Sequence, residues 1–211
     1  MPGFRHLQRS LRAKRLRSFL QHHKPDASTR ILDIGGTPPT WSFPETRHLS
    51  ASLLNIHPRI VPESEAARIA NMTGDATAMP FEDDSFDLAF SNSVIEHVGT
   101  LENQKKFAAE ARRVAKALWI QTPAREFFFE PHYFTPFIHW IPKSIRPRFV
   151  RWFTFWGWSS RPSKAQIQDQ VEELRLLSYR EMKDLFPDCE ILRERFMGMT
   201  KSYIATRQPG S

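Results

Sequence analysis

An acid and two glycines close a short apolar run near residue 30, and this combination could hold a ligand. The run Ile31–Ile34 is typical of a buried parallel strand, and Gly35 and Gly36 follow it directly. Asp33 would lie at the tip of that strand, where open α/β sheets bind their ligands. The glycines would let a ligand approach the backbone, because neither carries a Cβ atom. An ordinary strand that ends in a glycine turn gives the same pattern, so the rest of the chain must decide between the two.

Composition narrows the class of protein. The chain has 211 residues, of which 40% are hydrophobic and 25% are charged, which is typical of a soluble globular protein. Its one cysteine, Cys189, excludes a disulfide framework and any cysteine-based zinc finger, and no metal ligand set is predicted. No apolar run approaches the roughly 20 residues that a membrane span needs, so we expect a cytoplasmic protein. The net charge of +7 favours anionic partners, which include nucleic acid, phosphorylated or carboxylated substrates and an acidic membrane face.

The segment 1–27 precedes the first strand and is rich in arginine. Apolar residues recur at helical spacing within it, which predicts a basic amphipathic helix over 4–22. These residues are Phe4, Leu7, Leu11, Phe19 and Leu20. The helix would pack on the first strand with its charges in solvent, or its charges would bind an anionic surface or substrate.

Strand and helix patterns alternate through the segment 28–123. Strands are predicted near 31–34, 50–56, 86–91 and 117–122, with a short helix after Thr37 and a longer helix over 101–116. Residues 61–70 show little periodicity and are interpreted as a link between strands. The alternation predicts βαβ units and a parallel sheet.

The segment 124–161 interrupts this alternation. It holds 13 of the 26 aromatic residues of the chain, together with one lysine and several arginines. We interpret it as an insertion or lid. The remaining segment, 162–211, is predicted to form helices over 163–177 and 179–186 and an antiparallel strand pair over 190–196 and 201–206. A capping box marks the start of the second helix, because Ser178 is followed three residues later by Glu181.

The order of these motifs resembles a known family. Ile31–Gly36 is followed about forty residues later by Gly74-Asp75-Ala76 and then by the run from Met79 to Val98. This order is similar to that of the class I, S-adenosylmethionine-dependent methyltransferases, and specifically of the small type 11 methyltransferase domain. The resemblance implies one methyltransferase domain over 1–211. Its fold would be an α/β, Rossmann-like, seven-stranded, mostly parallel sheet with helices on both faces and an antiparallel last strand.

The resemblance also implies a binding site for S-adenosylmethionine. The glycine turn would lie along the methionine part of the cofactor, the Gly74–Ala76 turn would contact the adenine, and the end of the fourth strand would border the sulfonium. The residues that this comparison assigns to the cofactor are Asp33, Gly35, Gly36, Asn55, Asp75, Ala76, Met79, Ser91 and Asn92.

Two positions depart from the family pattern. Pro38 and Pro39 stand where the family has further glycines, and prolines remove backbone N–H donors from the loop. Asn55 stands where the family has an acid that binds the ribose hydroxyls, and a neutral group forms a weaker hydrogen bond than a carboxylate. A modest cofactor affinity is one consequence, and a non-catalytic binding module is the alternative.

Methyl transfer to a hydroxyl benefits from a base, and histidine is the side chain suited to that role near neutral pH. His132, with Tyr133 beside it, lies in the aromatic insertion, and His97 follows the fourth strand. These three residues are the predicted catalytic residues, and His139 is a weaker third histidine. Each histidine could instead be a packed, hydrogen-bonded residue of the fold.

The acceptor is not named by any motif. Aromatic faces stack on sugars, and aromatic residues mixed with arginines also suit a membrane interface. The sequence therefore predicts O-methylation of a small molecule, sugar or glycan hydroxyl, with peripheral contact to an anionic membrane. A nucleic-acid methyltransferase or RNA-binding module is the alternative that the positive charge suggests, although the base-flipping motif is missing after the fourth strand, where Ser91-Asn92-Ser93-Val94 stands.

Overall fold

A computed structural model describes residues 2–210, with side chains from Ala13 onward. The chain forms two compact units, of which the first comprises Met1–Asn92, Glu110–Ile120 and Thr206–Ser211, and the second comprises Ser93–Ala109 and Gln121–Ala205. The side chains of Phe4, Leu7 and Leu11, on which part of the predicted amphipathic helix rests, lie outside the described residues.

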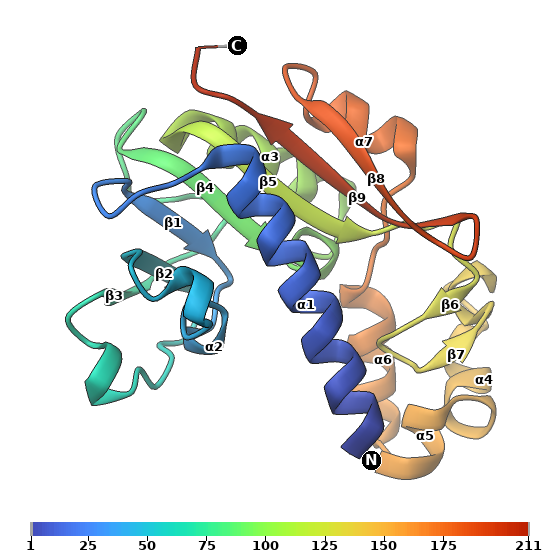
Figure 1. Ribbon diagram of the computed structural model, residues 1–211. Helices are drawn as coiled ribbons and strands as arrows, with labels where there is room; N and C mark the ends of the chain where they lie inside the picture. The colour runs from blue at the N-terminus through green and yellow to red at the C-terminus, as the bar shows by residue number, and fades with distance from the viewer. Residues whose placement is uncertain (1, 211) are drawn as a thin grey trace. The chain divides into compact units, whose positions relative to one another are not determined.

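The first half of the chain contains most of the parallel strands (Figure 1). Its elements are α1 (Pro2–His23), β1 (Ile31–Ile34), α2 (Pro38–Trp41), β2 (Ala51–Asn55), β3 (Ile69–Thr73) and β4 (Phe86–Asn92), with one-turn 3-10 helices at Pro44–Thr46 and Glu63–Glu65. The strand β3 begins inside the segment interpreted as a link, so that interpretation was wrong at its carboxyl end. Its side chains are mostly exposed, which explains why the segment lacks a buried-strand pattern.

The second half begins with a one-turn 3-10 helix at Ile95–His97 and continues through α3 (Leu101–Val114) and β5 (Ala115–Pro123). The aromatic insertion forms β6 (Phe129–Glu130), β7 (Thr135–Pro136), a 3-10 turn at Ile138–Trp140, α4 (Arg146–Phe153) and α5 (Phe155–Ser160). The last elements are α6 (Lys164–Glu173), α7 (Tyr179–Leu185), β8 (Glu190–Phe196) and β9 (Met199–Arg207). The helix α6 ends four residues before the predicted 177.

The main sheet has seven strands in the order β3-β2-β1-β4-β5-β9-β8. The pairs β1–β2, β1–β4 and β2–β3 are parallel, and Ile31 pairs with both Ala51 and Leu88. This order confirms the predicted Rossmann-like α/β fold. It also brings the carboxyl ends of β1, β2 and β4 to one edge of the sheet, where ligands of open α/β sheets bind.

Buried apolar side chains form the core of the first unit. Leu32, Ile34, Leu53 and Leu54 are at most 1% exposed, as expected for central strands that are covered on both faces. The helix α1 packs on β4 and β5, because the Phe19 ring lies 4.9 Å from Phe90 and 5.8 Å from Trp119 between centroids. The sequence predicted packing on β1, whereas these contacts place the helix on β4 and β5.

The insertion has a core of its own in the second unit. Seven buried side chains form this core, namely Tyr133, Ile138, Val150, Ile167, Val171, Leu174 and Leu176. Two capping boxes start the helices behind it, one of Ser163 with Gln166 and the predicted one of Ser178 with Glu181. The insertion is therefore a folded subregion that is packed against α6.

The helices α4 and α5 are joined by a tight contact. Thr154 donates its hydroxyl to the Val150 carbonyl and accepts the N–H of Gly157 at 2.9 Å. A Cβ atom at Gly157 would lie 2.1 Å from the Val150 carbonyl oxygen, so only glycine permits this approach. The junction leaves large aromatic side chains in solvent, with Trp152 74%, Phe153 69% and Trp158 73% exposed.

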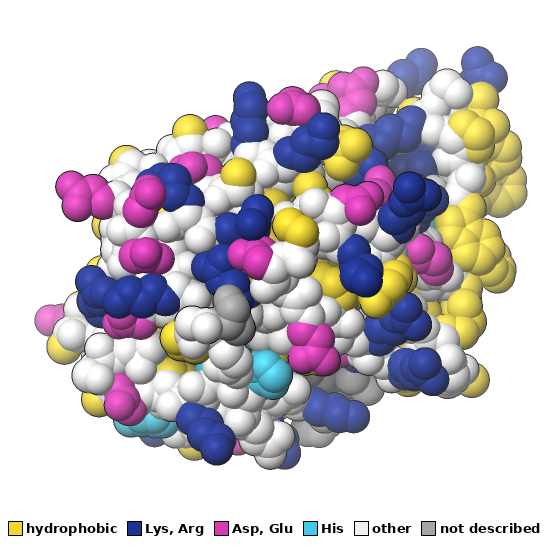
Figure 2. Space-filling model, turned by 90° about the horizontal axis from the view of Figure 1, so that it is seen from above, with side chains coloured by type: hydrophobic (Ala, Val, Ile, Leu, Met, Phe, Trp, Pro, Cys, Tyr) yellow, Lys and Arg dark blue, Asp and Glu magenta, His cyan; other side chains and the backbone are white. Residues whose placement is uncertain are grey.

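Hydrophobic side chains gather at one edge of the surface, with lysine and arginine side chains beside them (Figure 2). We call the exposed side chains of α4 and α5 the aromatic face, defined by Phe149, Trp152, Phe153, Phe155 and Trp158. Within the described residues, no helix has the length and apolar character needed to cross a bilayer.

Candidate active site

The glycine turn after β1 is built around the Asp33 carboxyl group. Asp33 is 1% exposed and accepts a hydrogen bond of 2.8 Å from Trp41 Nε1. A Cβ atom at Gly36 would lie 2.0 Å from Asp33 Oδ2, so this glycine is required by the buried acid itself. Gly35 has a positive φ of 73° and donates its N–H to the Leu54 carbonyl at 2.8 Å. The turn is thus fixed by Asp33 on one side and by the Leu54 carbonyl on the other.

The environment of Asp33 alters its titration. Burial raises the pKa of Asp33 to about 7, and the hydrogen bond from Trp41 offsets only part of that rise. A group that titrates near neutral pH inside a ligand-binding edge is typical of functional sites. Its raised pKa also has a structural cost, because a buried carboxylate with few partners is destabilising.

Thr37 offers hydrogen-bond donors in a loop where Pro38 and Pro39 have no backbone N–H groups. Its backbone N–H and its hydroxyl have no hydrogen-bond partner among the described residues, and the residue is half-buried before α2. Pro38 and Pro39 lack an N–H, so Thr37 is the last donor of the loop. The sequence interpretation missed this residue, although threonine before proline at the start of a helix is a recognisable N-terminal signal.

The Asn55 side chain ties the end of β2 to the glycine turn. Its Nδ2 donates to the Gly36 carbonyl at 3.0 Å, and its Oδ1 accepts from Arg59 Nε at 3.1 Å. The residue is 6% exposed. One amide hydrogen and one lone pair remain for a ribose hydroxyl. Asn55 therefore positions the loop, and its predicted ribose contact stays a prediction.

The Gly74–Ala76 turn has groups that suit an adenine. Asp75 Oδ1 accepts from both the N–H and the hydroxyl of Thr77 at 2.8 Å, which fixes the carboxylate while its other oxygen faces solvent. The Ala76 N–H has no partner among the described residues. A carboxylate acceptor and an adjacent N–H donor match an exocyclic amine and a ring nitrogen. A Cβ atom at Gly74 would lie 2.9 Å from Leu54 Cδ1, so a larger residue there would require the leucine side chain to shift.

Met79 follows this turn, and it is buried with both of its backbone polar groups hydrogen-bonded to the protein. It is 5% exposed, its N–H donates to Glu110 Oε2 at 2.6 Å, and its carbonyl accepts from Arg113 at 3.1 Å. Its predicted contact with the purine face is not tested by these bonds, which fix only its backbone.

Two residues at the end of β4 have different surroundings. Ser91 is fully buried and donates its hydroxyl to the Ile34 carbonyl at 3.1 Å, so it holds β4 to β1. Asn92 is half-buried, and its Oδ1 accepts from an Arg15 Nη1 atom at 2.6 Å. Arg15 lies on α1, so the N-terminal helix contributes a positive charge to the edge of the first unit. This contribution was not predicted for any single arginine.

The two predicted catalytic histidines meet in the second unit. His97 Nε2 and His132 Nε2 lie 3.0 Å apart. Each outer ring nitrogen faces a carboxylate, because His97 Nδ1 lies 3.2 Å from Glu173 Oε1 and His132 Nδ1 lies 2.5 Å from Glu130 Oε1. We call these four residues with Glu96 the histidine cluster. Sequence reasoning found the two histidines but missed the three glutamates.

Burial and charge act in opposite directions within the histidine cluster. Burial, with the neighbouring His132, lowers the pKa of His97. Burial opposes protonation of His132 as well, but its hydrogen bond with Glu130 and the nearby carboxylates raise the pKa of His132 overall. Burial also raises the pKa of Glu96 to about 7.

Tyr133 lies in the buried core of the insertion. It is fully buried, its hydroxyl lies 3.5 Å from the Gln170 carbonyl oxygen, and its ring is 6.1 Å from Trp156 between centroids. Burial raises the pKa of Tyr133 to about 12. These surroundings indicate that Tyr133 packs in the core, and its predicted catalytic role stays a prediction.

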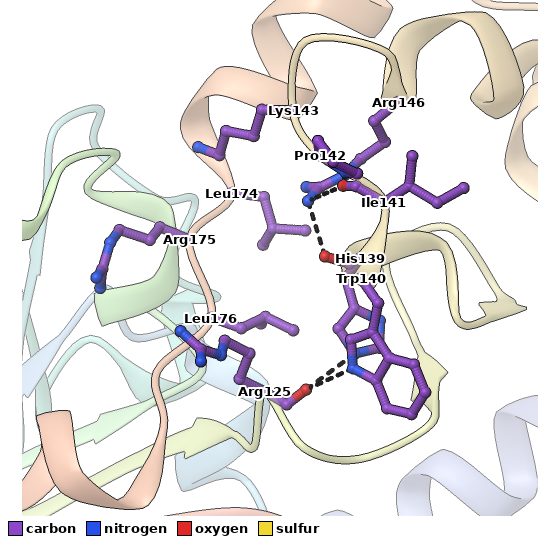
Figure 3. Close-up of a pocket in the computed structure, with 10 residues that line it drawn as sticks. All are labelled: Arg125, His139, Trp140, Ile141, Pro142, Lys143, Arg146, Leu174, Arg175 and Leu176. Atoms are coloured by element: carbon purple, nitrogen blue, oxygen red, sulfur yellow. Dashed lines mark hydrogen bonds between the residues drawn. The ribbon is translucent and has the colours of Figure 1, made fainter.

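A cavity of about 420 Å³ opens in the same unit (Figure 3). Four basic side chains line it, namely Arg125, Lys143, Arg146 and Arg175. Its other walls are His139, Trp140, Ile141, Pro142, Leu174 and Leu176. His139 Nε2 donates to the Arg125 carbonyl at 3.0 Å, while its buried Nδ1 has no partner among the described residues. We call this the basic cavity.

The basic cavity adjoins the histidine cluster through the backbone. Arg175 lines the cavity, and its N–H donates to the Glu96 carbonyl at 2.8 Å. Gln104 links the same two segments, because its Nε2 donates to the Ile95 carbonyl at 3.0 Å and to the Arg175 carbonyl at 2.8 Å. Burial and the positive charges of Arg146 and Arg175 lower the pKa of Lys143, which indicates a concentrated positive potential.

Comparison with known proteins supports the class of fold. A protein assigned as a sarcosine dimethylglycine methyltransferase from Galdieria sulphuraria is 20% identical, with a TM-score of 0.55, over 88% of this chain and 63% of that one. A protein assigned as a methyltransferase of an antibiotic biosynthesis pathway from Anabaena variabilis is 13% identical, with a TM-score of 0.55, over 87% and 64% of the two chains. The PH0226 protein of Pyrococcus horikoshii is 15% identical, with a TM-score of 0.56, over 96% and 91%.

The chain thus spans less than two thirds of the length of the first two of these structures. No curated protein sequence matches it at a significant level. At such low identity the structural likeness shows the fold alone, which is a Rossmann-like α/β sheet. Residues 47–117 match the family model described as a methyltransferase domain, type 11. This match covers 71 of the 211 residues, so the chain is similar to that family over about a third of its length.

The residues present fit the cofactor of this class at two of its three parts. The unpartnered Ala76 N–H and the oriented Asp75 carboxylate suit the adenine. The unpartnered donors of Thr37 suit the methionine carboxylate. At the ribose position the Asn55 amide is already bonded to Gly36 and Arg59, so only one amide hydrogen and one lone pair remain there, and no carboxylate is present.

Proposed function

We propose that this protein is an S-adenosylmethionine-dependent methyltransferase that methylates a hydroxyl group of a small molecule, sugar or glycan. The domain match supports the reaction class. The acceptor proposal depends on one observation: the histidine cluster adjoins a cavity that is lined by four basic side chains and Trp140. Proton-handling groups and a substrate-sized cavity therefore share one unit of the chain.

When bound, the cofactor supplies a methyl group on a sulfonium. The group that leaves is a neutral thioether, which needs no protonation. The protein's task is consequently to position the acceptor and exclude water. In this proposal Thr37, Asp75 and Ala76 bind the cofactor, and Asp33 shapes the loop. His97 and His132, with the carboxylates behind them, handle the proton of the acceptor hydroxyl.

The basic cavity favours an acceptor that carries a negative group. Arg146 is bound to the carbonyls of His139 and Ile141, which fixes its guanidinium as part of the wall. Lys143 reaches the Glu172 carbonyl at 2.9 Å and is exposed, so its ammonium can also meet a ligand. Trp140 is 52% exposed and offers an apolar face for a sugar ring. A phosphorylated or carboxylated sugar has this combination of groups.

The aromatic face supports a membrane as the place of the reaction. Its tryptophans are exposed beside Arg148, Arg151 and Arg161, a mixture that suits the interface of an anionic bilayer. We propose that the protein works on the cytoplasmic face of a membrane, which it contacts peripherally. An acceptor linked to a lipid would then be presented to the protein at that surface.

Calorimetry with S-adenosylmethionine followed by transfer assays tests this function. We expect binding of one equivalent, and a product one methyl group heavier when an anionic sugar or glycan hydroxyl is supplied. Replacement of His132 by alanine should reduce turnover and leave cofactor affinity unchanged. A chain that does not bind S-adenosylmethionine is a non-catalytic module, and this result would reject the proposal. Methyl incorporation into RNA and not into glycans would show that the acceptor is a nucleic acid and would reject the sugar or glycan acceptor.

A further inference from the structure

The contact between His97 and His132 raises a question of hydrogen positions. Both Nδ1 atoms face carboxylates, of Glu173 and Glu130 respectively, at 3.2 Å and 2.5 Å. An imidazole that donates its Nδ1 hydrogen to a carboxylate leaves a lone pair on Nε2. The two Nε2 lone pairs then face one another across 3.0 Å. Two lone pairs at this distance need a positive charge between them, which is a proton or a metal ion.

A third group beside the pair also lacks a partner. Glu96 is fully buried, and its Oε2 accepts from the Thr122 hydroxyl at 2.9 Å. Its Oε1 has no hydrogen-bond partner among the described residues. Buried carboxylate oxygens are costly when unpaired, and each one in a native structure requires an explanation. One ligand atom from each of Glu96, His97 and His132 lies within 4.8 Å of the other two.

The separation of the two Nε2 atoms suits a common ion. Nitrogen atoms of imidazole lie about 2.05 Å from zinc, so two of them 3.0 Å apart subtend about 94° at the ion. This angle fits neighbouring ligands of an octahedral ion, and a few tenths of an ångström of separation would give a tetrahedral one. Two imidazoles and one carboxylate are a ligand set used by transition metals, with a coordination position left open.

The outer carboxylates complete the pattern. Histidines that bind metals commonly donate their other ring N–H to a carboxylate, which fixes the tautomer and increases the basicity of the ligand. Glu130 is fully buried and accepts from both Nδ1 and the backbone N–H of His132. Glu173 plays the corresponding part for His97. Imidazole ligands favour zinc, cobalt, nickel or iron over magnesium and calcium.

We propose that Glu96, His97 and His132 bind one divalent transition-metal ion, oriented by Glu130 and Glu173. The ion takes the position between the two Nε2 atoms and pairs the free Glu96 oxygen. Its open coordination position accepts an acceptor hydroxyl and lowers the pKa of that hydroxyl. This last role rests on the proposed methyltransferase function and takes the place of the histidines as the group that activates the hydroxyl, whereas the binding of the ion depends on neither.

Metal binding is tested first, without reference to activity. The full-length protein is dialysed against a chelator, its fold is verified by circular dichroism, and Zn²⁺ and Co²⁺ are titrated by calorimetry and visible absorption. We expect one equivalent to bind, with cobalt absorption bands typical of nitrogen and oxygen ligands. His97→Ala and His132→Ala should each weaken binding by on the order of 100-fold or more, and Glu130→Gln by about 10- to 100-fold. His57→Ala, which changes an exposed histidine elsewhere, is the matched control and should bind normally.

Because Glu96 is buried, Glu96→Gln tests its role with little change of shape. It should weaken binding and alter the cobalt bands, and the unaltered chain provides the positive result even if this variant folds poorly. Failure of the folded protein to bind either ion would overturn the proposal and leave a shared proton between the histidines. Equal binding by His132→Ala and the unaltered chain would overturn it as well.

The catalytic role is tested separately. Chelation should abolish methyl transfer, added metal should restore it, and the calorimetric affinity for S-adenosylmethionine should stay unchanged. Transfer that persists after complete removal of metal would overturn the role of the ion and support a histidine base. Binding of one equivalent of metal by a chain that does not bind S-adenosylmethionine would support the metal site and reject the proposed function.

Discussion

Trp41 Nε1 donates a hydrogen bond of 2.8 Å to the carboxyl group of Asp33, and both side chains are almost completely buried. This pair occupies the space behind the glycine turn. Asp33 in turn determines that residue 36 must be glycine. The loop that would bind the methionine part of the cofactor is therefore shaped from behind by a buried acid.

The buried acid should make stability depend on pH. The pKa of Asp33 is about 7 in the folded chain, against 3.8 ordinarily, so the folded state keeps a proton that the unfolded state loses. Its contribution to the free energy of unfolding is fully present below about pH 4, falls as the pH rises to about 7, and is constant above that. The loss is on the order of 2–4 kcal/mol.

Asp33→Asn isolates this effect, because the amide keeps an acceptor for Trp41 and does not titrate. Urea unfolding of both proteins at pH 5 and pH 8 measures it. The variant should gain stability relative to the unaltered chain as the pH rises. An identical difference at the two pH values would show that Asp33 does not titrate in this range.

Gly36→Ala should destabilise the fold through a direct clash. The added Cβ would lie 2.0 Å from Asp33 Oδ2 and 2.7 Å from Asp33 Cβ, so the loop must shift. We expect a loss of about 2–3 kcal/mol in thermal or urea unfolding. Gly99→Ala is the control, because its Cβ meets nothing within 4 Å and only the positive φ of 83° is strained, at roughly 1 kcal/mol. Equal losses in the two variants would contradict the packing argument.

Asp75→Ala should weaken the binding of S-adenosylmethionine by about tenfold, because it removes the acceptor for the adenine amine. The substitution also removes the two hydrogen bonds from Thr77. Thr77→Val is the matched control, since it loses the hydroxyl contact but keeps the carboxylate. Calorimetry on both variants separates the two effects, and an equal loss of affinity in both would assign the effect to the turn.

Trp152→Ser combined with Trp158→Ser should reduce binding to vesicles that contain anionic lipid by tenfold or more. Each side chain is more than 70% exposed and would bury a large apolar area in the interface. Ile60→Ser is the control, because Ile60 is 94% exposed in the other unit. Vesicle co-sedimentation at low and high salt measures the binding. Retention of binding by the double variant would reject the aromatic face as a membrane contact.

The sequence predicted those parts of the fold whose signals are local. Ile31–Gly36 and the run from Gly74 to Val98 predicted the sheet because each combines a strand with a turn of fixed chemistry, and the second run lies within the residues that match the methyltransferase model. The strand Ile69–Thr73 was missed because it has few buried side chains. Tyr133 is buried in the core of the insertion, and a hydroxyl beside a histidine gives the same sequence pattern in a core as in a site.

The candidate site could be predicted only in part. His97 and His132 are 35 residues apart, and neither position predicts that their Nε2 atoms meet. Glu173 lies on a helix 76 residues from His97, and Glu130 is a buried strand residue with no motif of its own. Their roles depend on how the insertion packs against α6, which no short pattern reports.

Asn55 fastens the loop by donating a hydrogen to the Gly36 carbonyl. An aspartate at this position has no hydrogen to donate, and its carboxylate would face the carbonyl oxygen across the same 3.0 Å. A chain of this kind could therefore acquire the family's ribose-binding acid only if the loop changed in the same step. For protein engineering, the end of β2 and the glycine turn should therefore be exchanged together, because transferring either one alone from a relative would lose this hydrogen bond and lower the stability of the fold.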